Sequence, residues 1–231
     1  MENEGDDASI LRDIRDLAES NRVPLNIVGR GRFSAQARSE APQGVLALAA
    51  PLPEADLDDL LAGRRPAHGT TPGAAGEDGA VVPFVVALDG VTDPGNLGAI
   101  MRSAECAGVT GVVLPRHRAV HVTPAATKAA AGAVEHLPIA VVGGLPAALA
   151  RMRDAGVHVI GLDGQADRSL YDLAIPDGPV CLVLGAEGRG LSRLVRERCD
   201  DLVAIPMHGN LGSLNVSAAA ALACFEIARR L

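Results

Sequence analysis

Leu182-Val-Leu-Gly-Ala-Glu-Gly-Arg-Gly-Leu191 is an apolar run that ends in a glycine-rich turn with a single carboxylate, Glu187. A second segment, Ile205-Pro-Met-His-Gly-Asn-Leu-Gly-Ser-Leu-Asn-Val-Ser217, also passes from an apolar run through a polar loop, and it continues into an alanine-rich stretch. Each segment is typical of a buried strand that brings a loop to a ligand, because glycine permits positive φ and close approach of the backbone. Since only about twenty residues separate the two loops, we expect them to form two walls of one cleft.

A third segment has the same order of strand, polar turn and helix: Leu88-Asp-Gly-Val-Thr-Asp-Pro-Gly-Asn-Leu-Gly-Ala-Ile-Met-Arg-Ser-Ala-Glu105. Asn96 lies at the start of its predicted helix, where it can serve as an N-cap. Arg102 follows after six residues, which is close to two helical turns. Both side chains can therefore face the same end of the predicted sheet.

The polar residues of the two C-terminal loops have structural interpretations beside functional ones. Ser213 and Asn215 stand before the alanine-rich stretch, where side-chain oxygens cap the free amides of a helix. Glu187 can bind amides of its own turn, and Ile205 and Leu214 suit a packed core. For each loop alone, a structural turn and a ligand site are about equally good interpretations.

From Phe84 onward, apolar strand patterns alternate with helical patterns. Six strands are predicted, at Phe84–Leu88, Gly111–Leu114, Ile139–Val142, Val157–Gly161, Val180–Leu184 and Leu202–Ile205. Five helices are predicted, at Leu97–Ala107, Ala125–Ala133, Leu145–Ala155, Leu191–Arg198 and Val216–Leu231. Strands rich in Val, Ile and Leu that are separated by helices indicate an α/β fold with a parallel sheet covered on both faces.

Residues 1–50 predict a small α/β domain at the N-terminus. Apolar side chains recur at three- and four-residue spacing through residues 9–20, which indicates a helix. Short strands are predicted at Val23–Val28 and Gly44–Ala49. A unit of about fifty residues is small for an independent core, and the domain looks shortened at its start.

Residues 51–82 are predicted to be a flexible linker. Leu57, Leu60 and Leu61 indicate one short helix, and the Gly-, Pro- and Ala-rich sequence after it offers little to pack. Residues 83–231 then form the largest domain, which contains all three strand–loop–helix segments.

Composition and missing motifs exclude several classes of protein. No apolar run is long enough to span a membrane and no signal peptide is visible, so we expect a cytoplasmic protein. The four cysteines form no Cys-x-x-Cys pair and the histidines show no metal-ligand spacing, which predicts buried thiols, no disulfide and no metal. The Gly-x-Gly-x-x-Gly, P-loop and Gly-x-Ser-x-Gly motifs are absent, which argues against NAD enzymes, P-loop nucleotidases and the simplest hydrolases.

The net charge of −7 argues against a protein that coats nucleic acid unspecifically. It does not exclude RNA binding, because binding depends on the local distribution of charge. Arg22, Arg30, Arg32 and Arg38 follow one another without an intervening acid. This basic stretch is compatible with docking of RNA and equally with an ordinary solvated surface.

Taken together and in this order, the three loops resemble the three motifs of the SpoU (TrmH-like) family of RNA ribose 2′-O-methyltransferases, within the SPOUT superfamily. The resemblance covers about Val85 to Leu231. It implies a SPOUT-type parallel sheet whose C-terminal helix passes through a loop to form a trefoil knot, a topology that general folding rules would not predict. Pro42-Gln-Gly-Val-Leu also resembles the end of the RNA-binding domain that precedes the catalytic domain in many family members.

The resemblance implies a reaction and its partners. The expected activity is S-adenosylmethionine-dependent 2′-O-methylation of a ribose in structured RNA, and the two-domain layout favours 23S ribosomal RNA. A tRNA 2′-O-methyltransferase and a non-catalytic RNA-binding or assembly factor remain alternatives. The family also implies a homodimer that pairs through its first and last helices, and the helix at Val216–Ile227 is apolar nearly all round, as an interface helix would be.

The resemblance also assigns roles to individual residues. Backbone groups of three residues would hold the cofactor: Gly185, Ile205 and Leu214. Five side chains would form the catalytic centre: Asn96, Arg102, Glu187, Ser213 and Asn215. The family sometimes uses the arginine as a general base, but a guanidinium rarely gives up its proton. A backbone phosphate near Arg102 could accept the proton instead, or Arg102 could serve only to fix that phosphate.

Overall fold

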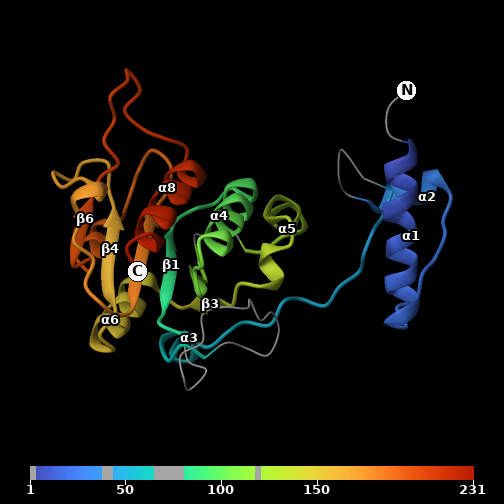
Figure 1. Cartoon of the computed structure of the whole chain (residues 1–231), viewed down its shortest axis with the longest axis horizontal. Coiled ribbons are helices and arrows are strands. Elements are labelled where there is room, and N and C mark those ends of the chain that lie inside the picture. Colours follow the sequence, from blue (N-terminus) through green and yellow to red (C-terminus); the bar gives the residue numbers. More distant parts are fainter. Residues whose placement is uncertain (1–3, 38–43, 65–80, 118–120) are drawn as a thin grey trace. The chain divides into compact units, whose positions relative to one another are not determined.

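The computed structural model describes residues 4–37, 44–64, 81–117 and 121–231 (Figure 1). The chain divides into two compact units, Met1–Pro51 and Leu52–Leu231. Two features of the sequence, Arg38 in the basic stretch and Pro42-Gln in the family-like turn, lie outside the described residues.

The first unit contains two helices and, within its described residues, no strand. Helix α1 spans Glu4–Ser20, which confirms the helix expected at residues 9–20, and α2 spans Arg30–Gln36. The strands expected at Val23–Val28 and Gly44–Ala49 are wrong, because neither segment pairs with a neighbouring strand in the described chain. The described part of this unit is therefore helical and irregular, and the α/β character expected for it is also wrong.

The missing strands have a physical reason. A strand needs a partner for its backbone groups and a face to bury, and among the described residues these two segments have neither. Ile27 is 82% exposed and Leu48 is 96% exposed, so their apolar side chains find no core. Pro24 additionally removes a backbone donor from the first segment.

The start of the second unit differs from the expected linker. Helix α3 (Leu57–Leu61) confirms the short helix, and its Asp56 N-cap accepts a hydrogen bond from the amide of Asp58 at 2.7 Å. Leu57 and Leu60 are buried in the core of this unit rather than held in a tether. The expectation of a flexible linker from residue 51 is thus wrong for residues 52–61, and residues 65–80 lie outside the described chain.

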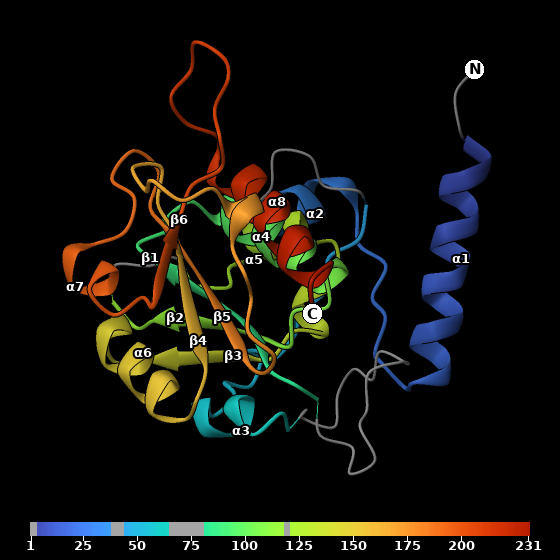
Figure 2. The ribbon, with the colours of Figure 1, turned by 60° about the vertical axis from the view of Figure 1, so that its left-hand side comes forward.

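A six-stranded parallel sheet forms the centre of the second unit (Figure 2). Its order is β3-β2-β1-β5-β4-β6. The strands are β1 (Phe84–Asp89), β2 (Gly111–Pro115), β3 (Ile139–Val142), β4 (His158–Leu162), β5 (Val180–Gly185) and β6 (Asp201–Val203). Every neighbouring pair is parallel, and all six strands predicted from the sequence are confirmed.

Helices cover both faces of this sheet, as predicted. They are α4 (Pro94–Cys106), α5 (Pro124–Ala130), α6 (Leu145–Asp154), α7 (Arg193–Arg196) and α8 (Val216–Ala228), with short 3₁₀ turns at Ala133–Glu135 and Leu170–Asp172. Helix α5 ends early because Ala131 and Gly132 adopt positive φ angles of 48° and 92°. Helix α7 is also shorter than the expected Leu191–Arg198, because the residues before it belong to the closing arm of the glycine-rich turn.

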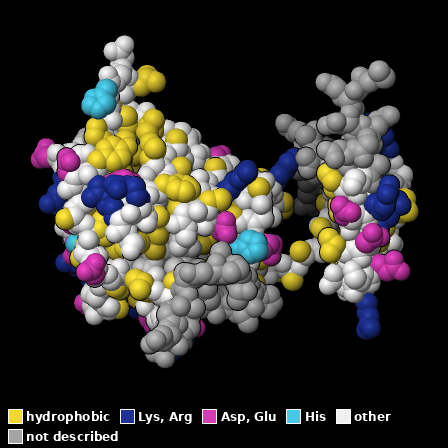
Figure 3. All heavy atoms as spheres, in the orientation of Figure 1, with side chains coloured by type: hydrophobic (Ala, Val, Ile, Leu, Met, Phe, Trp, Pro, Cys, Tyr) yellow, Lys and Arg dark blue, Asp and Glu magenta, His cyan; other side chains and the backbone are white. Residues whose placement is uncertain are grey.

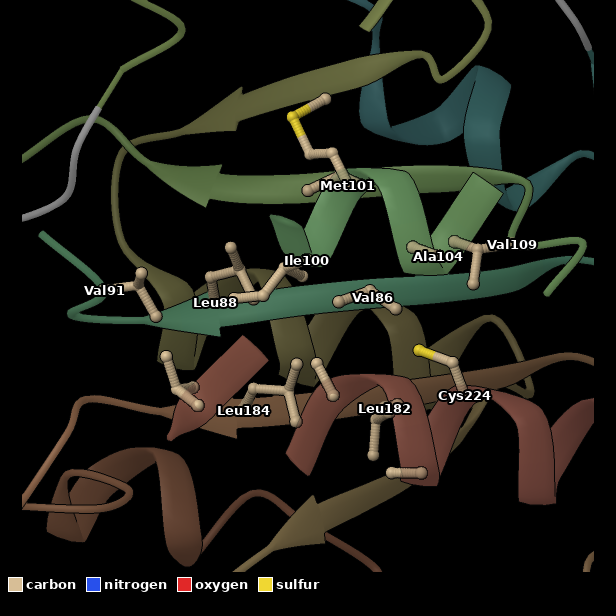
Figure 4. Close-up of a cluster of buried hydrophobic side chains, with 14 of the residues drawn as sticks. Val86, Leu88, Val91, Ile100, Met101, Ala104, Val109, Leu182, Leu184 and Cys224 are labelled. Atoms are coloured by element: carbon tan, nitrogen blue, oxygen red, sulfur yellow. The ribbon is translucent and has the colours of Figure 1, made fainter. Parts of the chain in front are cut away.

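Successive side chains of each strand point to opposite faces of the sheet and pack into two separate cores. Val86 and Leu88 of β1 lie in the core under α4, α5 and α8, whereas Val85 and Ala87 face α3 and α6. Figure 4 shows Ile100 of α4 and Cys224 of α8 among the buried side chains of the first core, together with Val86 and Leu88 of β1. Burial raises the pKa of the Cys224 thiol to about 12, so this thiol stays protonated and packs as a small apolar group.

The cysteine prediction holds only in part. Cys181 and Cys224 are buried, and Cys199 is partly buried, but Cys106 at the end of α4 is exposed. No helix in the described residues is long and apolar enough to cross a membrane.

Candidate active site

The three sequence motifs meet at one junction, which is built around a carboxylate. Oε1 of Glu187 accepts hydrogen bonds from Nδ2 of Asn96 and from Nδ2 of Asn215, both at 3.0 Å. Nδ2 of Asn215 also donates to Oδ1 of Asn96 at 3.0 Å. The backbone amide of Val216 lies 3.5 Å from the same carboxylate oxygen. We call Asn96, Glu187 and Asn215 the junction triad.

The sheet register brings these loops together. Asp89, the last residue of β1, lies opposite Gly185, the last residue of β5, so the loops that follow both strands start side by side. Helix α4 begins after the first loop and α8 begins after the third, and the two helices pack against each other. Both N-termini thus approach Glu187, where the helix dipole stabilises a negative charge.

Capping residues fix the two helix starts. Oδ1 of Asp93 accepts a hydrogen bond from the amide of Asn96 at 2.7 Å, so the N-cap of α4 is Asp93 and not Asn96. This leaves the Asn96 side chain available for the triad. Asn215 is the N-cap of α8, with Oδ1 accepting from the amide of Ser217 at 2.8 Å, and it belongs to the triad through its Nδ2 atom.

The glycine-rich turn is closed upon itself. Ala186 and Gly190 exchange two backbone hydrogen bonds, of 3.2 and 2.8 Å. A Cβ on Gly185 would lie only 2.1 Å from the carbonyl carbon of Gly190, so glycine is required there by the turn itself. Oδ2 of Asp89 accepts from the amide of Ser192 at 2.6 Å, which fastens the turn to β1. Glu187 is therefore held on a short, tightly closed loop.

The structure does not bring every predicted residue into this junction. Arg102 lies on an exposed part of α4, about 9 Å along the helix axis from Asn96, and makes no side-chain hydrogen bond or ion pair with the described residues. Ser213 is exposed and likewise has no hydrogen bond within the described chain. Both side chains remain available to a ligand.

The predicted cofactor residues flank one projecting loop. Ile205 is buried at its first end, beside α8 in the core, and Leu214 is 41% exposed at its second end. Residues 206–215 between β6 and α8 stand out from the body of the second unit (Figures 1 and 2). None of the amides of residues 207–214 donates to another backbone group in the described chain.

Two positioning residues were missed from the sequence. Asp89 and Asp93 both accept backbone amides next to the triad. Their signals were present: Asp89 directly follows an apolar strand, and Asp93 precedes a proline, which is a common helix start.

Other features of the second unit lie away from the junction. Two hollows lie at the opposite, amino-terminal edge of the sheet, one beside His158 and Arg198 and one beside Thr110 and Leu231. No group of three His, Cys, Asp or Glu side chains among the described residues is placed to bind a metal. The elements that form the junction therefore carry the side-chain amides of Asn96 and Asn215, the carboxylate of Glu187, and the exposed guanidinium groups of Arg102 and Arg189.

Comparison with known proteins agrees with this geometry. Residues 83–225 match the profile of the SpoU rRNA Methylase family. A protein of Photobacterium profundum, named 23S rRNA (guanosine-2'-O-)-methyltransferase RlmB, is 37% identical over 224 residues, which cover 96% of this chain and 83% of the relative. A Pseudomonas putida protein of the same name is 36% identical over 230 residues, covering 98% of this chain and 86% of the relative.

Solved structures show the same fold. The SpoU methyltransferase AviRb from Streptomyces viridochromogenes, in complex with AdoMet, is 32% identical with a TM-score of 0.59, and the match covers 64% of this chain and 57% of that one. An AdoMet-bound rRNA methyltransferase from Sinorhizobium meliloti is also 32% identical, with a TM-score of 0.59, over 64% of this chain and 56% of its own. With three motifs at one junction, a parallel sheet of this order and a match over more than half its length, this chain belongs to the SpoU rRNA Methylase family.

Proposed function

We propose that this protein transfers a methyl group from S-adenosylmethionine to the 2′-hydroxyl of a ribose in 23S ribosomal RNA, a reaction of the cytoplasm. The junction triad carries the proposal, because it joins the three motif loops around one carboxylate. Arg102 on α4 and Ser213 in the loop before α8 have no side-chain partner among the described residues. The names of relatives that match nearly the whole chain support ribosomal RNA as the substrate.

The loop at 206–215 fits a cofactor that is recognised by backbone groups. Its amides have no backbone acceptor in the described chain, Ile205 is buried at one end of it, and Leu214 lies exposed at the other. We assign the backbone groups of Gly185, Ile205 and Leu214 to the cofactor. When bound, S-adenosylmethionine supplies a sulfonium-activated methyl group, so the protein has to orient the ribose and assist removal of one proton.

Arg102 and Ser213 face the RNA in this proposal. Arg102 fixes a backbone phosphate by two parallel hydrogen bonds, which suits an exposed guanidinium that has no partner in the described part of the chain. That phosphate, rather than the guanidinium, takes the hydroxyl proton. Ser213 contacts the target nucleotide, and the junction triad keeps the three loops in register during the reaction.

A homodimer belongs to the same proposal. Leu222 and Phe225 on α8 are 44% and 52% exposed, and Figure 3 shows hydrophobic side chains gathered over this helix. A second copy would cover this face and place its own chain next to the junction. Light scattering on wild type and Phe225→Asp checks this: we expect a dimer for the first and a 23.6 kDa species for the second, and a monomeric wild type would contradict it.

We further propose that the path from β5 to α8 is knotted. After β6 at the sheet edge, the chain returns to pack α8 against α4 and β5 in the middle of the unit. The guanidinium of Arg230 then donates to the carbonyl oxygens of Tyr171 and Leu173. Stretching the unfolded chain in an optical trap tests the knot, since a tightened knot shortens the contour below about 3.5 Å per residue. A full-length contour would contradict it.

The reaction is tested by single-turnover transfer from labelled S-adenosylmethionine to unmodified 23S ribosomal RNA and to tRNA, followed by mapping of 2′-O-methyl positions. We expect one modified ribose in the ribosomal RNA, with transfer unaffected by a chelator. Methylation of tRNA alone would favour the tRNA alternative. Binding of ribosomal RNA without heat on titration with the cofactor would favour the non-catalytic factor.

A further inference from the structure

The arginines of the second unit divide into two groups. Nine of the twelve in its described part form ion pairs: Arg64, Arg116, Arg151, Arg153, Arg168, Arg193, Arg196, Arg229 and Arg230. The other three are Arg102, Arg189 and Arg198, whose side chains are exposed and make no hydrogen bond or ion pair with described residues. An arginine without an internal partner is available to an external anion.

Two of these three arginines lie on the elements that carry the junction triad. Arg102 lies on α4, and Arg189 follows Glu187 by two residues in the glycine-rich turn. The Cα atoms of Arg189 and Glu187 are thus at most about 7 Å apart. Arg198 instead lines the hollow beside His158 at the opposite edge of the sheet. This difference in place makes Arg198 a matched control for Arg189.

Arg189 has no ion-pair partner among the described residues, although three carboxylates lie near the junction. Glu187 accepts the amides of Asn96 and Asn215, Asp89 accepts the amide of Ser192, and Asp93 caps α4. Each of these carboxylates thus accepts neutral donors at one oxygen, and none of the three forms an ion pair with an arginine in the described chain. Farther along the sheet, at the end of β4, Asp163 does pair with an arginine, Arg196 at 3.1 Å.

The backbone that carries Arg189 is also held in place by the turn. The two hydrogen bonds between Ala186 and Gly190 close the backbone around it, and its neighbours Gly188 and Gly190 have φ angles of 74° and 65°. Only the side chain of Arg189 must be ordered when it binds a ligand, which lowers the entropic cost of the contact. A guanidinium in this position matches the oxygens of a phosphate.

We propose that Arg189 is a second phosphate contact for the RNA substrate, one that sets the register of the strand whose ribose is presented to the junction. The inference rests on the proposed function and adds a binding residue to it. Arg189 contacts RNA away from the reacting ribose, so its loss should raise KM for RNA and leave kcat at saturating RNA within about twofold.

The test measures binding of an unmodified 23S ribosomal RNA transcript to wild type, Arg189→Ala, Arg189→Lys and Arg198→Ala over a series of salt concentrations. For Arg189→Ala we expect about tenfold weaker binding near physiological salt, and a slope of log K against log salt smaller by about 0.7 to 0.9. Arg189→Lys should keep the slope, because it keeps the charge, and recover part of the affinity. Arg198→Ala should behave as wild type.

Two results would overturn the inference: wild-type affinity and slope in Arg189→Ala, or an equal loss in Arg198→Ala, which would indicate a general charge effect.

Binding does not depend on turnover, so the proposed function and the proposed role of Arg189 can be contradicted separately. Wild type that binds the transcript but transfers no methyl group contradicts the proposed function, and the salt slopes still decide on Arg189. Wild type that binds no RNA contradicts both. Thermal melting confirms that each variant folds, as expected for exposed positions.

Discussion

The junction triad and the ion pairs at the start of β6 use carboxylates in opposite ways. At the junction, Glu187 is bound by side-chain amides, and the nearby arginines have no partner in the described chain. At the start of β6, Asp200 pairs with Arg153 at 2.8 Å, and Asp201 pairs with His158 at 2.9 Å and Arg168 at 2.6 Å. Charges at β6 neutralise each other, whereas those at the junction remain available for a ligand.

This difference separates stability from function within one sheet. Partly exposed ion pairs such as that of Asp201 with Arg168 stabilise a fold by about 0.2–1 kcal/mol each. The junction triad orders three loops that are far apart in sequence, so its loss should act on turnover more than on folding. Substitutions at four positions test this division, in order of decreasing expected effect.

Arg102→Ala should abolish methyl transfer while cofactor affinity stays within a few-fold. The guanidinium is expected to hold a phosphate at the transition state, whereas the cofactor lies on the C-terminal loops. Arg102→Lys should also lose most activity, because lysine keeps the charge but not the planar fork. Single-turnover methylation and calorimetric titration measure both quantities, with Arg198→Ala as control. Near-normal transfer by Arg102→Ala would remove this residue from the mechanism.

Glu187→Ala should lower the single-turnover rate by about a hundredfold, because the amides of Asn96 and Asn215 lose their common acceptor and the loops shift. Glu187→Gln keeps an oxygen acceptor at the same place and should stay within about tenfold of wild type. Comparing the two variants separates hydrogen bonding from charge. If both lose the same activity, the negative charge matters and the proposed acceptor role is wrong.

Asp89→Ala should reduce turnover by about tenfold through the glycine-rich turn, which loses its bond from the amide of Ser192. Asp89→Asn retains an acceptor oxygen and should restore most of the rate. Hydrogen exchange of the amide of Ser192 provides a second readout, with faster exchange in Asp89→Ala only. Unchanged exchange in that variant would show that Asp89 does not hold the turn.

Asp201→Asn should leave methyl transfer unchanged and lower stability by at most about 1 kcal/mol, or about 2–4 °C in Tm. Screening should shrink that difference in about 1 M salt. Thermal melting at two salt concentrations, beside a transfer assay, gives the answer. If Asp201→Asn lost methyl transfer without losing stability, the proposed division between a stabilising region at β6 and a functional region at the junction would be wrong.

The strands of the parallel sheet could be predicted from the sequence, but the side-chain geometry of the candidate site could not. Strands such as Phe84–Asp89 and Val180–Gly185 are continuous apolar runs, and buried parallel strands require this pattern. The motif residues Asn96, Glu187 and Asn215 were identified by resemblance. Their mutual hydrogen bonds depend on the register of β1 with β5, which no local pattern encodes.

The errors arise where local patterns lack tertiary partners. Val23–Val28 has strand-forming residues, but in the described chain it finds no neighbour to pair with. Leu57–Leu61 is too short for a reliable period, yet the sheet buries two of its leucines. Asn96 could serve as the N-cap of α4 by its place in the sequence, but Asp93, three residues earlier, is the residue that caps this helix.

The long sequence separation within the junction triad has a consequence for the life of the molecule in the cell. Asn215 and Asn96 are 119 residues apart, and Asn215 stands at the entrance to the last described helix. A chain interrupted between the end of β6 and Asn215 would contain the whole sheet and still lack the triad. During synthesis the site therefore forms only after nearly all of the second unit has left the ribosome. Under the proposed function, methyl transfer to RNA therefore requires a chain that has been synthesised through Asn215 and α8, and shorter copies cannot carry it out.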